Sequence, residues 1–250
     1  MKIIPLSEGA FTIDKTKVFV PFDTEKEELN SRPTGSLLVE IQPFVIVTDT
    51  DIILLDTGLG YNDADGKPQL HNNLLKAGIN PSQVTRVLMS HLHKDHSGGI
   101  TVKDEFSQNR FIGFPYATYY VQKREFEYAL QEGNPASYHP EDFSILADFS
   151  RVVWLTEDEG EIDGFIRYQL TGAHSKFHQV FTIMDGDKKI FFGGDDAPQL
   201  QQMKSRFVAK YDYDGKKCME LRQQWWEEGQ RDNWTFLFYH DIKSPVWPAL

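Results

Sequence analysis

Short apolar runs separated by polar or Gly/Pro breaks recur along the chain and predict β-strands. Residues 36 to 56 carry two such runs on either side of Asp49-Thr50-Asp51, a pattern that predicts a hairpin. Further runs predict strands at 86–90, 152–155, 165–170, 180–184, 189–192 and 234–239. Residues 1 to 35 are broken by prolines and indicate short strands plus a surface loop.

Helical composition appears between these runs. Residues 72–77 and 122–131 are each followed by a glycine, which commonly ends a helix. Two more helices are predicted at 198–209 and 219–228, and residues 212–215 between them indicate a turn. Strands and helices alternate in both halves of the chain, which predicts a layered α/β fold.

Length and composition limit the domain organisation. The chain has 250 residues, of which 13% are aromatic, so a folded unit with a sizeable core is expected. No linker or repeat marks a boundary, and we therefore expect one domain over residues 1–250, with 1–35 as its N-terminal strands and loop.

The charge and the cysteine content limit which classes of partner and which cellular compartment are expected. The formal net charge of −11 disfavours nucleic acid, because phosphate backbones are repelled by an acidic surface. Cys218 is the single cysteine, so no intramolecular disulfide can form. The N-terminus does not resemble a signal peptide, and no apolar run is long enough to cross a bilayer. A cytoplasmic location without a membrane partner is the expectation.

The segment His91-Leu92-His93-Lys94-Asp95-His96 concentrates four possible metal ligands directly after a predicted strand. Imidazole and carboxylate are the usual protein ligands of zinc and related ions. In an extended chain His91 and His93 point to the same side, and the following Gly98-Gly99 lets the backbone turn closely around a site. This segment predicts a metal centre that needs further ligands from elsewhere.

The H-x-H-x-D-H pattern followed by Gly-Gly resembles the signature of the metallo-β-lactamase superfamily. That resemblance implies a four-layer αββα sandwich with two metals at one edge of its sheets. It also implies three later ligands, which His174, Asp195 and His240 match in order, each at the end of a predicted strand. Asp196 is a rival to Asp195, but Gly194-Asp195 fits the pattern better.

Other residues near these motifs receive supporting roles in the same comparison. Asp56 matches a family position that is usually structural, and His178 is expected to hold its loop or another ligand. Asp212 and Asp214 lack the spacing of a calcium loop, so they are interpreted as part of a turn.

The resemblance implies two divalent ions, zinc first and iron or manganese as alternatives. His91, His93 and His174 would hold one ion, and Asp95, His96 and His240 the other, with Asp195 bridging them. A hydroxide between the ions would then attack the substrate, and Asp95 would pass a proton to the leaving group.

Chain length and motif order resemble the lactonase branch, which implies a small carboxylic ester or lactone, such as an acyl-homoserine lactone, as substrate. One departure is Pro198, which stands where lactonases usually carry a tyrosine. Four tyrosines are the candidates to replace it: Tyr116, Tyr119, Tyr120 and Tyr239. Thioester hydrolysis, for example of a glutathione conjugate, phosphodiester hydrolysis and metal binding without turnover remain the alternatives.

Overall fold

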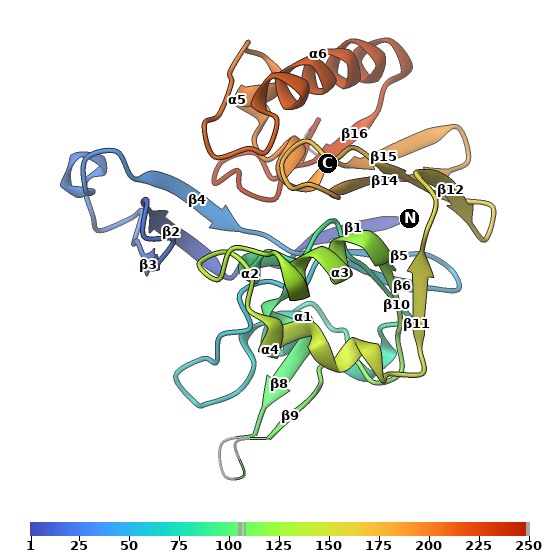
Figure 1. The fold of residues 1–250 in the computed structure, drawn as a ribbon. Coiled ribbons are helices and arrows are strands. Elements are labelled where there is room, and N and C mark those ends of the chain that lie inside the picture. The colour runs from blue at the N-terminus through green and yellow to red at the C-terminus, as the bar shows by residue number, and fades with distance from the viewer. Residues whose placement is uncertain (105–106, 108, 249–250) are drawn as a thin grey trace.

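A computed structural model describes the chain except for residues 105–106, 108 and 249–250. Two six-stranded sheets face each other (Figure 1). The first has the order β1-β5-β6-β7-β10-β11 and the second β12-β13-β14-β15-β16-β17. The strands of the first sheet are β1 (Lys2–Pro5), β5 (Phe44–Val47), β6 (Ile52–Leu55), β7 (Arg86–Leu88), β10 (Thr118–Gln122) and β11 (Val152–Leu155).

The second sheet is built almost wholly from the C-terminal part of the chain. Its first four strands are antiparallel neighbours, β15 and β16 are parallel, and β17 closes the edge antiparallel to β16. Its strands are β12 (Glu159–Ile162), β13 (Ile166–Leu170), β14 (Gln179–Asp185), β15 (Lys188–Phe192), β16 (Thr235–Leu237) and β17 (Val246–Trp247).

Alternating side chains explain why helices cover both outer faces. In β5, Phe44 and Ile46 point into the core between the sheets, while Val45 between them points to the outer face. In β15, Phe192 joins the central core and Phe191 the outer cluster. Each sheet therefore buries both faces, which needs a helix layer on either side. The predicted four-layer αββα arrangement is confirmed.

The helices on the first sheet precede those on the second sheet along the chain. Helices α1 (Gln69–Lys76), α3 (Lys123–Gln131) and α4 (Pro140–Phe143) pack on the first sheet. Helices α5 (Leu200–Met203) and α6 (Gly215–Asp232) pack on the second. The one-turn helix α2 (Lys94–Ser97) follows β7. Among the described residues no helix is long and apolar enough to cross a membrane.

Two smaller sheets lie outside the sandwich. Strands β2 (Gly9–Ile13), β3 (Phe19–Pro21) and β4 (Leu37–Ile41) form a three-stranded sheet that projects to the left in Figure 1, here called the projecting sheet. Strands β8 (Thr101–Lys103) and β9 (Arg110–Ile112) form a hairpin. The short strands expected within residues 1–35 are thus confirmed.

Most predicted elements are found, with one clear exception. The hairpin around residues 49–51 is β5 and β6, and the predicted helix at 219–228 extends over the whole of α6. The helix predicted at 198–209 is wrong beyond Met203. The buried guanidinium of Arg222 donates to the carbonyl of Phe207 at 2.6 Å and to that of Asp196 at 2.9 Å. These tertiary bonds hold the 204–214 segment against α6 as irregular chain.

Candidate metal centre

The predicted ligand motif forms a tight turn between β7 and β8. His91 and His93 follow β7, and Asp95 and His96 lie in α2. The turn is possible because Gly98 and Gly99 pack against other backbone: a Cβ on either would lie 2.2 Å from the carbonyl oxygen of Leu59 or Thr57. The glycines therefore allow the motif to sit directly on the loop that follows β6.

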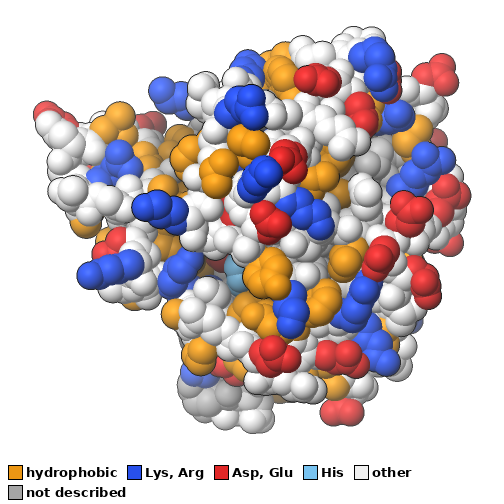
Figure 2. Space-filling view, turned by 45° about the horizontal axis from the view of Figure 1, so that its top comes forward, with side chains coloured by type: hydrophobic (Ala, Val, Ile, Leu, Met, Phe, Trp, Pro, Cys, Tyr) orange, Lys and Arg blue, Asp and Glu red, His pale blue; other side chains and the backbone are white. Residues whose placement is uncertain are grey.

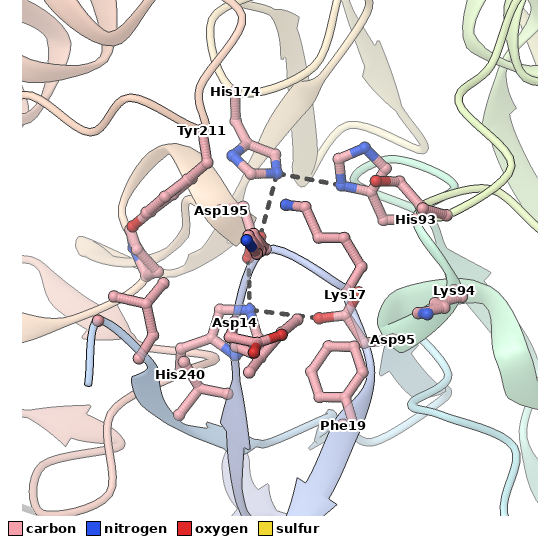
Figure 3. A pocket seen from close by; sticks show the side chains of 18 residues that line it. Asp14, Lys17, Phe19, His93, Lys94, Asp95, His174, Asp195, Tyr211 and His240 are labelled. Atoms are coloured by element: carbon pink, nitrogen blue, oxygen red, sulfur yellow. Dashed lines mark hydrogen bonds and ion pairs between the residues drawn. The ribbon is translucent and has the colours of Figure 1, made fainter. Parts of the chain in front are cut away.

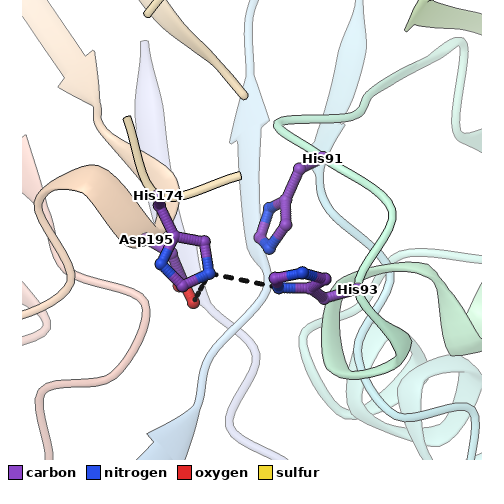
Figure 4. Close-up of side chains that lie close together, drawn as sticks. All are labelled: His91, His93, His174 and Asp195. Atoms are coloured by element: carbon purple, nitrogen blue, oxygen red, sulfur yellow. Dashed lines mark hydrogen bonds and ion pairs between the residues drawn. The ribbon is translucent and has the colours of Figure 1, made fainter. Parts of the chain in front are cut away.

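Four side chains converge on one side of this turn (Figure 4). Ligand atoms of His91, His93, His174 and Asp195 all lie within 4.8 Å of one another. His174 enters from the loop after β13, and its Nε2 is 3.1 Å from Nδ1 of His93. Burial lowers the pKa of His91 and of His93 well below 6.5, which favours the neutral imidazole that a metal ion binds.

A second set lies beside the first. Ligand atoms of Asp95, His96 and His240 are also within 4.8 Å of one another. His240 comes from the chain that follows β16, so this set joins the two halves of the sandwich. Oδ2 of Asp95 is 3.7 Å from Nε2 of His96 and 3.6 Å from Nε2 of His240.

Asp195 stands between the two sets. Its Oδ2 is 3.2 Å from Nε2 of His174, while its Oδ1 is 3.0 Å from Nε2 of both His96 and His240. Burial alone would raise the pKa of this carboxyl, but the positive potential of His240, His96 and His174 outweighs it and holds the pKa well below its usual range. One carboxylate oxygen thus faces each set.

The ring nitrogens that point away from the cluster are held by oxygen atoms. His96 Nδ1 is 2.7 Å from Asp56 Oδ2, and His240 Nδ1 is 2.7 Å from the carbonyl oxygen of Glu40. His174 Nδ1 is 2.9 Å from Asp212 Oδ1. These contacts favour the tautomers in which Nε2 is free to bind a metal ion.

The buried donor set fits divalent metal ions. Nε2 of His91 is buried and has no hydrogen-bond partner among the residues that the structure describes, an arrangement that costs free energy unless a ligand binds it. A third grouping of Asp56, His91 and His96 does not fit a metal. Asp56 already accepts hydrogen bonds from Ser90 N at 2.7 Å and Ser90 Oγ at 2.6 Å, besides its contact with His96.

His178 and Asp196 support the cluster from behind. His178 Nδ1 is 3.0 Å from Asp196 Oδ2, and its Nε2 accepts a hydrogen bond from the backbone N–H of Asp195 at 3.2 Å. Asp196 also accepts from the N–H of His174 at 2.7 Å. The expectation that His178 holds its loop agrees with these contacts, and Asp196 points away from the ligand atoms that Asp195 faces.

A pocket of about 280 Å³ opens above the cluster (Figure 3). Its lower part is lined by ligand residues from both sets, and its walls come from the projecting sheet and the 204–214 segment. In the space-filling view a histidine is visible at the bottom of a hollow bordered by hydrophobic and basic side chains (Figure 2). The cluster is therefore reachable by a small molecule.

Two functional residues of this site escaped the sequence analysis. Asp212, interpreted there as part of a turn, does lie in the turn before α6, but its carboxylate also orients His174. Tyr211 lines the pocket, and burial raises the pKa of its hydroxyl to about 12, so the group is protonated at neutral pH. Both residues lie in one short polar turn, and that was the only signal the sequence offered. Nothing in the turn indicates that Asp212 contacts His174 or that Tyr211 reaches the pocket.

The four tyrosines considered as replacements at Pro198 do not line this pocket. Tyr239 stacks on His96 with ring centroids 4.0 Å apart and donates its hydroxyl to the carbonyl oxygen of Asp95 at 2.7 Å. Tyr119 is buried in the apolar cluster between the first sheet and its helices, and the hydroxyl of Tyr120 accepts a hydrogen bond from Arg86. Tyr116 is 64% exposed. Among the tyrosines that the structure describes, Tyr211 is the one on the pocket wall.

Comparison with known families agrees with this architecture. The sequence profile of the metallo-beta-lactamase superfamily matches residues 41–215. The chain belongs to this superfamily. The matched residues include both the H-x-H-x-D-H segment and Asp195, so the resemblance stated from the motifs is confirmed.

Individual relatives are more distant. The N-acyl homoserine lactonase AttM of Azorhizobium caulinodans is 33% identical over 119 residues, which are 42% of this chain and 38% of that protein. The match thus spans less than half of that relative. A probable metal-dependent hydrolase from Staphylococcus aureus has a TM-score of 0.79 at 21% identity, covering 98% of this chain and 91% of its own. AidC, described as a dizinc quorum-quenching lactonase, has a TM-score of 0.74 at 18% identity, covering 98% and 88%.

Proposed function

We propose that this chain is a two-metal hydrolase that cleaves a small carboxylic ester or lactone. The observation that carries the proposal is the position of Asp195, whose two oxygens face two separate groups of buried ligand atoms. A shared carboxylate between two ligand sets is the arrangement expected for a pair of neighbouring divalent ions.

The donor chemistry suits zinc, with iron or manganese as alternatives. His91, His93 and His174 would hold one ion, Asp95, His96 and His240 the other, and Asp195 both. When bound, such a pair supplies Lewis acidity and lowers the pKa of water toward neutrality. The neighbouring fold of AidC, named a dizinc lactonase, is consistent with this assignment.

The residues of the chain supply positioning and proton transfer. Asp95 lies at the pocket and can move a proton to the leaving oxygen as the acyl carbon–oxygen bond breaks. Tyr211 offers a protonated hydroxyl from the opposite wall, suited to donate a hydrogen bond to the substrate carbonyl. Asp56 and Asp212 keep the histidine rings in place during the reaction.

Pocket size and relatives favour an ester or lactone over larger substrates. A volume of about 280 Å³ lies at the small end of ligand sites and suits a compact molecule. AttM and AidC are both named lactonases, although AttM matches this chain over less than half of its length.

The test is a panel of matched substrates with one zinc-loaded preparation. Lactone or aryl ester should give the highest kcat/KM when compared with thioester, phosphodiester and cephalosporin. If phosphodiester or cephalosporin exceeded both by a factor of about 100, equivalent to about 2.7 kcal/mol of transition-state stabilisation, the ester assignment would be wrong. No turnover of any substrate by a protein with two bound metals would favour a metal-binding role without catalysis.

A further inference from the structure

Three lysines line the pocket; Lys15 is exposed to solvent, whereas Lys17 and Lys94 are partly buried above the ligand cluster. Lys17 closes the turn between β2 and β3, where it adopts a positive φ of 59°. Lys94 is the first residue of α2, inside the ligand motif. Both line the pocket and both are partly buried. Figure 3 shows the Lys17 side chain reaching over the cluster toward His174 and Asp195.

Neither ammonium group forms an ion pair within the part of the chain that the structure describes. Each ammonium group lies over an aromatic ring: Lys17 Nζ is 5.9 Å from the ring centroid of Tyr211, and Lys94 Nζ is 5.7 Å from that of Phe19. The nearby Asp14 uses its carboxylate within its own turn, accepting from the N–H and hydroxyl of Thr16. The two positive charges are therefore available to a ligand.

The charges of the two lysines reinforce each other at the mouth of the pocket. This positive potential contrasts with the net charge of −11 for the whole chain. Asp14, Asp95 and Asp195 also line the pocket, but Asp14 is engaged in its own turn and the other two are assigned to the metal ions, so the lysine charges face an incoming anion.

Part of the wall next to the lysines is apolar. Ile13, Phe19, Leu37 and Val39 of the projecting sheet line the pocket next to the lysines. A ligand that fits this surface combines a short apolar part with a negatively charged group. Lysine acts as a point charge, which binds either a carboxylate or a phosphate.

We propose that the substrate is a small ester or lactone bearing an anionic group, which the ammonium groups of Lys17 and Lys94 bind while the ester faces the ligand cluster. The proposal rests on the proposed hydrolase function and specifies its substrate class. In the reaction, water adds to the acyl carbon, the acyl carbon–oxygen bond breaks, and the products are a second carboxylate, a hydroxyl group and one proton. The anionic group does not itself react.

The experiment compares three γ-butyrolactones that carry a carboxylate, a phosphorylated hydroxymethyl group or a carboxamide at the same ring carbon. The wild-type kcat/KM should be at least about tenfold higher for one of the two anionic lactones than for the carboxamide. Which anion is preferred distinguishes the two sources of negative charge. The preference should shrink as ionic strength rises.

Three variants and one matched control locate the effect. Lys17→Met and Lys94→Met should each bring the ratio of anionic to neutral kcat/KM toward one, a loss of about 10- to 100-fold, since hydrogen bonds to charged groups have this strength. Lys17→Arg should retain the preference. Lys76→Met is the matched control, because it removes one charge from the exposed end of α1, away from the pocket.

A binding measurement separates this inference from the hydrolase proposal. Calorimetry should detect 2-hydroxyglutarate, the product of the carboxylated lactone, or the phosphorylated product, and Lys17→Met should weaken that binding about 10-fold or more. Hydrolysis of the carboxamide lactone with equal or higher kcat/KM than both anionic lactones would overturn the inference and leave the hydrolase intact. Absence of hydrolysis with anion binding still dependent on Lys17 would instead overturn the hydrolase and support the anion site.

Discussion

The floor and the wall of the pocket are built in different ways. The floor is the cluster of seven candidate ligands, five of which line the pocket itself. Ring nitrogens that point away from the cluster are held by buried oxygens such as those of Asp56 and Asp212. The wall consists of the projecting sheet and the 204–214 segment, and it includes exposed side chains such as Tyr211, which is 39% exposed. The floor is thus fixed by buried polar contacts, as a metal centre requires, and we expect the more exposed wall to select the substrate.

The largest effect should follow from removing the group shared by both ligand sets. Asp195→Ala is expected to lower kcat/KM by more than about 100-fold and to reduce bound metal, because both sets lose a ligand. Metal analysis and kinetics on the same preparation measure this. Asp196→Asn is the neighbouring control: it should lower the melting temperature, through its bonds to His174 and His178, more than it lowers metal content. The reverse pattern would show that the two aspartates have been assigned wrongly.

Asp212 and Asp214 form a matched pair in one turn. Asp212→Asn should lower metal affinity or kcat/KM about 10- to 100-fold, because the contact with His174 Nδ1 is weakened. Asp214 instead caps α6 by accepting from the N–H of Lys217 at 3.0 Å. Asp214→Ala should cost about 1 kcal/mol of stability and leave metal affinity unchanged. Competition titration with a chelator distinguishes them, and equal losses of affinity would refute the orienting role of Asp212.

Metal affinity should increase with pH. Although burial opposes it, the charge of Asp195 raises the pKa of His174 and of His240 above 6.5 in the metal-free protein. Incoming ions must displace those protons, so affinity is low when pH is below the raised pKa values and increases as pH rises through them. The expected slope is about tenfold per pH unit for each proton displaced. A chelator-buffered titration at several pH values tests this, and a flat profile would contradict it.

The smallest effect concerns the wall. Tyr211→Phe removes one hydroxyl that can bond the substrate, so kcat/KM should fall by about 2- to 10-fold without loss of metal. Tyr116→Phe, at a tyrosine that is 64% exposed and outside the pocket, serves as the control. A loss of metal in the Tyr211 variant would mean that this residue supports the floor instead.

The same contrast explains what the sequence could predict. The strands were visible as apolar runs, which predicted a layered α/β fold. The sandwich and the later ligands of the floor were implied by the resemblance of the short motifs to the metallo-β-lactamase superfamily. The wall depends on tertiary contacts: the bond from Arg222 to Phe207 replaces the predicted helix after Met203. Asp212 contacts His174, which lies 38 positions earlier in the chain, and no local sequence pattern predicts such a contact.

The central claim is that the floor holds two metal ions per chain. Protein purified without chelator, or stripped and reloaded with zinc, should contain close to two equivalents by elemental analysis, and Asp195→Ala should contain fewer. This expectation rests on the two sets of ligand atoms, on Asp195 between them and on the buried Nε2 of His91. A wild-type value near zero that added zinc, iron or manganese cannot restore would contradict the two-metal account.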